Sequence, residues 1–116
     1  MEQQKLVLKD GTEIIDGYAS KSSNNNLMIR IPGNDLVQAA ITFSDPNKTE
    51  TIISYYSIYK YTYTGYTDMY TVQYFSDENY VELWLKPDKD EEATVKRELT
   101  VPAEYVPYEK EGLSNA

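Results

Sequence analysis

The stretch YYSIYKYTYTGYTDMY, residues 55–70, decides the fold because it places seven tyrosines and one glycine in sixteen positions. Aromatic and β-branched residues favour strands over helices. Successive side chains of a strand alternate between its two faces, so Tyr59, Tyr61 and Tyr63 share one face. The sequence therefore predicts a strand with a row of phenol rings along one side.

Three interpretations of this row are open. The rings can cover one face of a small sheet, with their hydroxyls at the rim, or they can form a stacking platform for sugars or bases. They can also form a protein-binding face, because tyrosine offers a large amphipathic contact area with few torsions to freeze. The candidates for protein binding are Tyr55, Tyr59, Tyr61, Tyr63 and Tyr66.

The N-terminal third predicts short strands joined by turns. In KLVLKDGTEII, two apolar runs flank Asp10-Gly11, a pair typical of a type I′ hairpin turn with positive φ at both residues. The predicted strands span 5–9 and 12–15. Further strands are expected at 18–20 and 27–31, the second of which is closed by Pro32-Gly33.

One short helix is expected near residues 35–43. Asn34 or Asp35 can cap it, apolar residues recur at helical spacing from Leu36 to Phe43, and Asp45-Pro46 ends it.

From Thr49 the sequence predicts strands in TIISYYSI, YKYTYT, MYTVQYF and YVELWL, separated by Gly65, Asp68 and SDEN. In the third of them, Tyr70, Val72 and Tyr74 are expected to share a face. Residues 94–101 alternate weakly and predict an edge strand.

The expected fold class is mainly β (α+β): a single antiparallel sheet, or a small sandwich or barrel, with one short helix. At 116 residues the chain fits one domain. We expect this domain over residues 1–101 and a loosely ordered acidic tail over 102–116. The predicted core residues are Leu6, Leu8, Ile14, Leu27, Ile29, Ile31, Leu36, Phe43, Ile52, Val72, Val81, Leu83 and Leu85.

The composition narrows the chemistry. The chain has no cysteine and no histidine, which removes thiolate and imidazole nucleophiles, general bases and metal ligands. The five glycines are scattered, so no phosphate-binding loop is predicted. We expect no enzymatic activity, no catalytic residue, no metal and no cofactor.

The net charge of −8 disfavours direct binding to nucleic acid or to an anionic membrane. The N-terminus lacks the residue order of a signal peptide, and no apolar run is long enough to span a bilayer. We therefore expect a soluble protein that is not secreted through a signal peptide.

The acidic residues suggest a second function. Residues 77–116 hold eleven acids and five bases, and carboxylates can occupy the positions of phosphates when a protein mimics nucleic acid. The candidates for such mimicry are Asp77, Glu78, Glu82, Asp88, Asp90, Glu91 and Glu92.

The order of LVLKDGTEI, DLVQAAITFSDPNKTETI, YTGYT and YVELWLK, over residues 5–86, resembles small proteins encoded in the structural-gene modules of phages and prophages of low-GC Gram-positive bacteria. The resemblance implies a virion-associated or accessory phage protein without a catalytic role, located in the host cytoplasm or in the virion. It assigns no functional residues.

Two functions are therefore expected, in order of preference. The first is a protein-interaction or virion assembly module of a tail or baseplate, which binds a phage structural protein or itself as a homo-oligomer through a strand edge or the tyrosine face. The alternative is an acidic phage-encoded inhibitor of a host nucleic-acid enzyme, of the anti-restriction or anti-CRISPR type.

Overall fold

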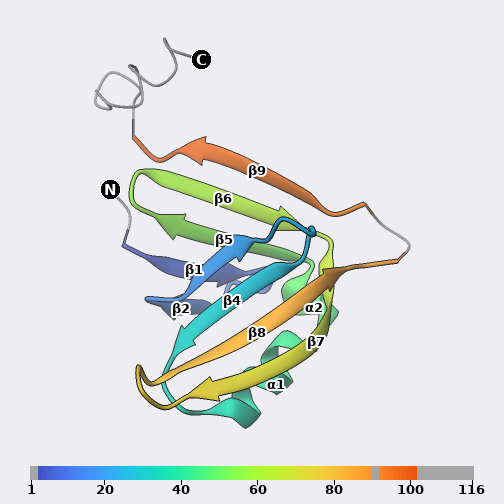
Figure 1. Cartoon of the computed structure of the whole chain (residues 1–116). Helices are drawn as coiled ribbons and strands as arrows, with labels where there is room; N and C mark the ends of the chain where they lie inside the picture. Colours follow the sequence, from blue (N-terminus) through green and yellow to red (C-terminus); the bar gives the residue numbers. More distant parts are fainter. Residues whose placement is uncertain (1–2, 90–91, 102–116) are drawn as a thin grey trace.

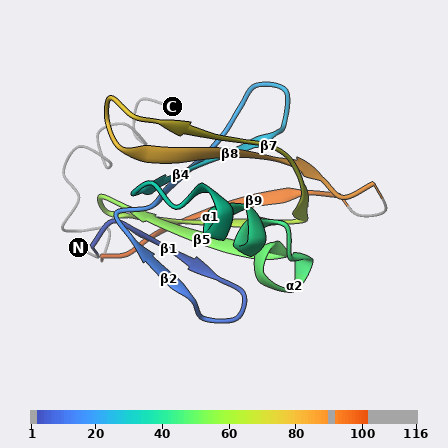
Figure 2. The same cartoon turned by 90° about the horizontal axis from the view of Figure 1, so that it is seen from below.

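The fold is a small sandwich of two antiparallel sheets, as the computed structural model of the chain shows for residues 3–89 and 92–101. Within these residues the five-stranded sheet has the order β2-β1-β5-β6-β9 and the four-stranded sheet the order β3-β4-β8-β7. The predicted mainly-β class with a short helix is confirmed, and the layers are seen edge-on in Figure 2. The predicted tail at 102–116 lies outside the described residues.

The strands follow the sequence pattern closely. The five-stranded sheet contains β1 (Lys5–Leu8), β2 (Glu13–Ile15), β5 (Thr51–Tyr56), β6 (Tyr59–Thr64) and β9 (Thr94–Leu99). The four-stranded sheet contains β3 (Tyr18–Lys21), β4 (Leu27–Pro32), β7 (Tyr66–Phe75) and β8 (Tyr80–Pro87). The predicted edge strand near residues 94–101 is confirmed as β9, at one border of the five-stranded sheet.

The first hairpin forms where it was predicted, but its turn is of another type. Gly11 has a φ of 90°, whereas Asp10 does not take the positive φ that a type I′ turn needs. Gly11 N–H donates to the Leu8 carbonyl at 2.9 Å, and the Asp10 carboxylate accepts from Thr12 N–H at 3.0 Å. The chain thus makes a type I turn that a left-handed glycine completes.

Two helices link β4 to β5 where one was predicted. Helix α1 (Leu36–Phe43) is capped by Asp35, which accepts from Gln38 N–H at 2.9 Å. Asp45-Pro46 was expected only to end this helix, but Asp45 caps a second helix, α2 (Pro46–Thr49), in which proline fits the first turn.

The core lies between the two sheets and under α1. Nine of the predicted core residues are buried, while Ile14, Ile31 and Val72 are only partly buried against them. Leu36 was predicted wrongly: it is 36% exposed, because α1 turns Ala39 and Phe43 toward the sheets instead. The buried hydrophobic residues that the prediction omitted are Ala19, Ala39, Tyr63 and Tyr66.

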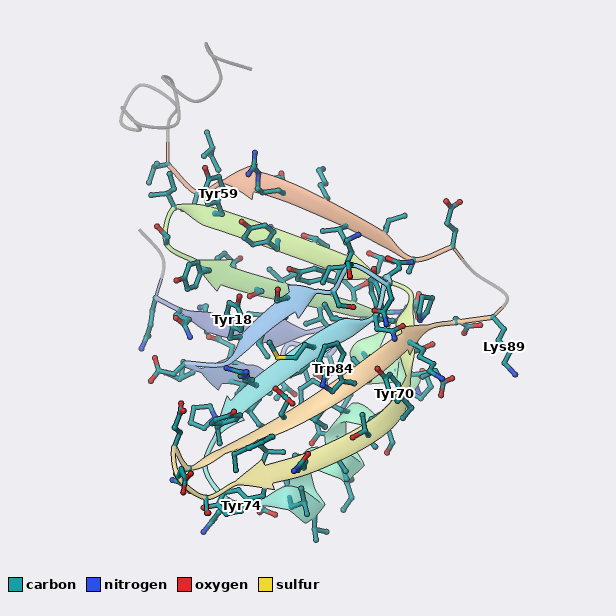
Figure 3. All side chains as sticks on the ribbon, viewed as in Figure 1. Tyr18, Tyr59, Tyr70, Tyr74, Trp84 and Lys89 are labelled. Atoms are coloured by element: carbon teal, nitrogen blue, oxygen red, sulfur yellow. The ribbon has the colours of Figure 1, made fainter. Side chains whose placement is uncertain are left out.

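Strand β7 contains two register shifts, between Tyr66 and Asp68 and between Met69 and Thr71. Asp68 was expected to separate strands, yet it lies inside β7. The second shift turns Tyr70 away from the face of Val72, and Met69 packs against the core in its place. Tyr70 is 44% exposed (Figure 3), and Lys86 Nζ lies 4.7 Å from its ring centroid.

The two sheets are offset sideways. Strand β3, at the border of the four-stranded sheet, contacts β5 and β1 of the other sheet. At the opposite border, α1 and α2 pack against β7, and α1 also packs against β8. Strands β6 and β9 therefore extend beyond β3 (Figure 1).

Gly65 lies where the chain passes from β6 in one sheet to β7 in the other. Its N–H donates to the Glu50 carbonyl at 3.0 Å, and its own carbonyl accepts from Asp88 N–H at 2.8 Å. Gly65 has a φ of 91°, and a Cβ atom added to it would lie 3.1 Å from Ala93 Cα. The chain crosses between the sheets before β5, between β6 and β7, and after β8. These three connections thus meet at Gly65, which has no side chain.

We predict that Gly65→Ala lowers the free energy of unfolding by about 2–4 kcal/mol, because alanine meets both the positive φ and the backbone of Ala93. Gly11→Ala is the matched control, since Gly11 has a φ of 90° but no atom within 4 Å of an added Cβ. It should cost only about 1–2 kcal/mol. Equal losses in urea unfolding would show that the close approach at Gly65 is unimportant.

Candidate functional site

The rings of Tyr59, Tyr61, Tyr63 and Tyr66, called here the tyrosine row, touch one another in sequence. Their centroids are separated by 5.9 Å from Tyr59 to Tyr61, by 6.3 Å from Tyr61 to Tyr63 and by 6.3 Å from Tyr63 to Tyr66. The first three rings lie on one face of β6, as the alternation predicted, opposite residues of β5 and β9. The fourth follows Gly65 at the start of β7.

The row runs from the core to the surface. Tyr66 and Tyr63 are 0% and 4% exposed, so these two predicted binding residues are core residues. Tyr61 and Tyr59 are both partly exposed, and Tyr61 packs against the core. The inner end of the row therefore packs the sandwich, and its outer end remains accessible.

Tyr55 lies on the opposite face of the sheet from the tyrosine row, whereas Tyr56 lies on the same face as the row. Tyr55 pairs with Lys60 on the outer face of the five-stranded sheet, where its ring also receives Lys5 Nζ at 5.5 Å. Tyr56 is 47% exposed, and its ring packs edge-on against Tyr18 at 5.7 Å. Sequence analysis missed Tyr56, although it pairs with Tyr59 across the tight turn that joins β5 to β6.

The overhang of β6 and β9 beyond β3 forms a groove, called here the tyrosine groove, with a volume of about 360 Å³. Val95 of β9 lines its outer side and is 40% exposed. Lys21 is the charged residue among those that line it, at the end of β3. Figure 3 shows Tyr18 and Tyr59 on this side of the molecule. The lining residues are Tyr18, Ala19, Ser20, Lys21, Tyr56, Tyr61, Tyr63 and Val95.

The buried phenols are held neutral. Burial raises the pKa of the Tyr63 hydroxyl, and the neighbouring phenols Tyr61, Tyr18 and Tyr66 raise it further. Burial also raises the pKa of Tyr66. Tyr63 Oη donates to the Ala19 carbonyl at 3.4 Å, and Tyr66 Oη donates to Asn25 Oδ1 at 2.8 Å. These hydroxyls act as structural hydrogen-bond donors, since the phenolates are disfavoured.

The acidic candidates are divided between the two ends of β8. Asp77 and Glu78 are exposed in the turn between β7 and β8. Asp88 and Glu92 lie beyond the other end of that strand, where the Asp88 carboxylate accepts from Thr67 Oγ1 at 3.2 Å.

The remaining acids do not join the two groups. Glu82, within β8, is paired with Arg30 at 3.2 Å, so much of its charge is compensated. Asp90 and Glu91 lie outside the described residues. The structure therefore does not arrange the acids that it describes into one row.

A second apolar surface surrounds α1. Val37 and Ile41, one helical turn apart, are 70% and 58% exposed. Beside them a cavity of about 440 Å³ has Ile14, Ala39 and Phe43 among its lining. Asp35 also lines this cavity, but its carboxylate already caps α1.

No three acidic side chains come together as metal ligands in the part of the chain that the structure describes. Over the same residues, no helix has the length and apolar character needed to cross a membrane.

Comparisons with known proteins leave this site without a precedent. No family model, no curated protein and no solved structure matches the chain.

We predict that alkaline pH destabilises the fold through Tyr63. Its raised pKa means that the unfolded chain loses this proton first, so the stabilising contribution is complete below about pH 10 and falls as pH rises above it. One such phenol contributes a slope of about −1.4 kcal/mol per pH unit. Urea midpoints between about pH 8 and 11 measure this slope, and Tyr63→Phe should reduce it. Tyr55→Phe is the control, and an unchanged slope in Tyr63→Phe would contradict the assignment.

Proposed function

We propose that this chain is a non-enzymatic protein-interaction module that binds its partner at the tyrosine groove. The observation that carries the proposal is the accessible outer end of the tyrosine row. Tyr56, Tyr59 and Tyr61 present rings that are neither in the core nor scattered singly over the surface. Tyrosine clusters of this kind are enriched in protein interfaces.

The groove has the features of a hot spot. Tyr61 and Tyr63 form its stacked floor, with an interplanar angle of 14°, and the buried Tyr63 anchors the partly exposed Tyr61. Rings fixed in this way lose little conformational freedom when a partner binds. Val95 adds an apolar side chain at the rim.

The partner in this proposal is a phage structural protein or a second copy of the chain itself, and the role is assembly of a virion, its tail or its baseplate. This part rests on the sequence resemblance over residues 5–86. The place of action that it implies is the host cytoplasm during assembly, and then the virion.

The alternative, an acidic inhibitor of a host nucleic-acid enzyme, has less support. A duplex mimic needs carboxylates in rows at the spacing of phosphates, on rigid elements. The length of β8 separates the pair Asp77 and Glu78 from Asp88 and Glu92, and Arg30 pairs with the intervening Glu82. We therefore retain the assembly module as the first proposal.

Affinity capture tests this proposal. The immobilised chain is exposed to a lysate of the bacterium that carries its gene, after phage induction, and we expect it to retain a phage structural protein. The double variant Tyr56→Ala/Tyr59→Ala should weaken binding about 10-fold or more, because interface aromatics commonly carry 1–3 kcal/mol each. Its urea midpoint should change little, since both rings are outside the core.

Tyr55→Ala is the matched control, because it removes a phenol from the outer face of the same sheet. Retention of a host nuclease that is lost in Asp77→Asn/Glu78→Gln, and kept in the tyrosine variant, would favour the inhibitor instead. Equal retention of the phage protein by all variants would contradict the groove as the binding site.

A further inference from the structure

Among the described residues, helices cover one border of the sandwich, and no helix or strand covers the other. Where β7 and β8 extend past the five-stranded sheet, α1 and α2 pack against them. Where β6 and β9 extend past β3, no described helix or strand lies over their inner face. We propose that a second copy of the chain covers this face, by inserting its own β6 and β9 over it. This inference rests on the proposed function and names the partner of the tyrosine groove.

Both borders of the uncovered face are strand edges. Strand β3 pairs with β4 on one side, and β9 pairs with β6 on one side; among the described residues neither has a second neighbour. Unpaired edges present rows of N–H and C=O groups that accept another strand. The overhang thus has an edge in each layer, β3 in one sheet and β9 in the other.

The directions of these edges allow them to pair with each other. Tyr18 begins β3 and contacts Tyr56 at the end of β5, while Tyr63, which pairs with the beginning of β5, reaches the next β3 residue, Ala19. Strand β3 therefore runs opposite to β5. It also runs opposite to β9, because β5 and β9 are both antiparallel to β6 (Figure 1).

A two-fold axis parallel to the strands, within the overhang, brings the two copies together. It places β9 of each copy antiparallel beside β3 of the other, and it turns the inner faces of the two β6–β9 pairs toward each other. The four-stranded sheet of one copy then continues into the five-stranded sheet of its partner. The interface is isologous, so it closes after two copies.

The side chains of the face suit contact with themselves. Tyr59, Tyr61 and Val95 supply rings and a branched apolar side chain, and Arg97 already stacks on Tyr59 with its guanidinium carbon 4.8 Å from the ring centroid. Lysine and arginine lie over tyrosine rings at four places within the described residues. Lys21 at the groove rim is placed to do the same across the interface.

The interface is small. Two strands of six residues cover about 10 by 20 Å at ordinary strand spacing and rise. Together with two edge pairings this is below the standard size of a stable interface, so we expect a dissociation constant in about the micromolar range.

Sedimentation velocity of the full chain between about 1 and 100 µM tests the proposal, and we expect a concentration-dependent dimer. Val95→Lys puts a cation on the paired face and should weaken the dimer about 10-fold or more. Thr94→Lys puts the same charge on the outer face of the same strand and should change it little. A monomer at all concentrations, or equal effects of the two lysines, would overturn the proposal.

Disulfide trapping tests the geometry separately, because the chain has no cysteine of its own. Ser20 of β3 and Lys96 of β9 lie on the outer faces of different sheets in one molecule, but in the proposed dimer they share one outer face. Ser20→Cys/Lys96→Cys should oxidise to a covalent dimer that joins position 20 to position 96. A dimer joined from 20 to 20 would overturn this arrangement in favour of two paired β3 edges.

The failure of this inference is distinguishable from that of the proposed function. A monomer that still retains a phage protein, with the loss in Tyr56→Ala/Tyr59→Ala, would overturn the self-pairing alone. It would indicate that the groove is reserved for another chain.

Discussion

The fold depends on two buried phenol rings, Tyr63 and Tyr66, that flank a glycine in the sequence, and an added side chain at this glycine would crowd the backbone of Ala93. Tyr63 and Tyr66 are buried between the two sheets, which Gly65 joins. Their rings pack against each other, with centroids 6.3 Å apart. Their hydroxyls also act within the fold. Tyr63 ties β6 to β3 across the sandwich, and Tyr66 ties β7 to the loop after β3 through Asn25. Phenylalanine would supply the same packing without these links.

The same row of rings connects the stability of the fold to the proposed binding site. Because the sheets are offset, the row continues past β3, and its outer members emerge from under the four-stranded sheet. The buried Tyr63 supports Tyr61, and Tyr61 in turn contacts Tyr59, so the accessible rings are held in place before the proposed partner binds. Within the described residues, one feature, the sideways offset of the layers, leaves the inner face of β6 and β9 without a covering element and the edges of β3 and β9 without a second strand.

The sequence predicted the location of most strands and helices, whereas the burial of their side chains depended on how these elements pack. Turn residues and period-2 alternation located the strands, and alternation correctly placed Tyr59, Tyr61 and Tyr63 on one face. Alternation does not predict how deeply each side chain is buried. The burial of Tyr63 and the partial exposure of Tyr59 depend on which part of β6 the four-stranded sheet covers. The shift in β7 that exposes Tyr70, and the packing angle of α1 that exposes Leu36, likewise depend on neighbouring elements rather than on their own residues.

Comparing the unfolding free energies of Tyr63→Ala and Tyr59→Ala tests most directly whether the row passes from core to surface. Tyr63→Ala should cost about 3–5 kcal/mol through lost burial and a cavity. Tyr59→Ala, at the accessible end, should cost about 1 kcal/mol or less. Thr62→Ala, from the opposite face of β6, is the control. Equal losses at both tyrosines, whether small or large, would contradict the account, because the row would then be wholly exposed or wholly core.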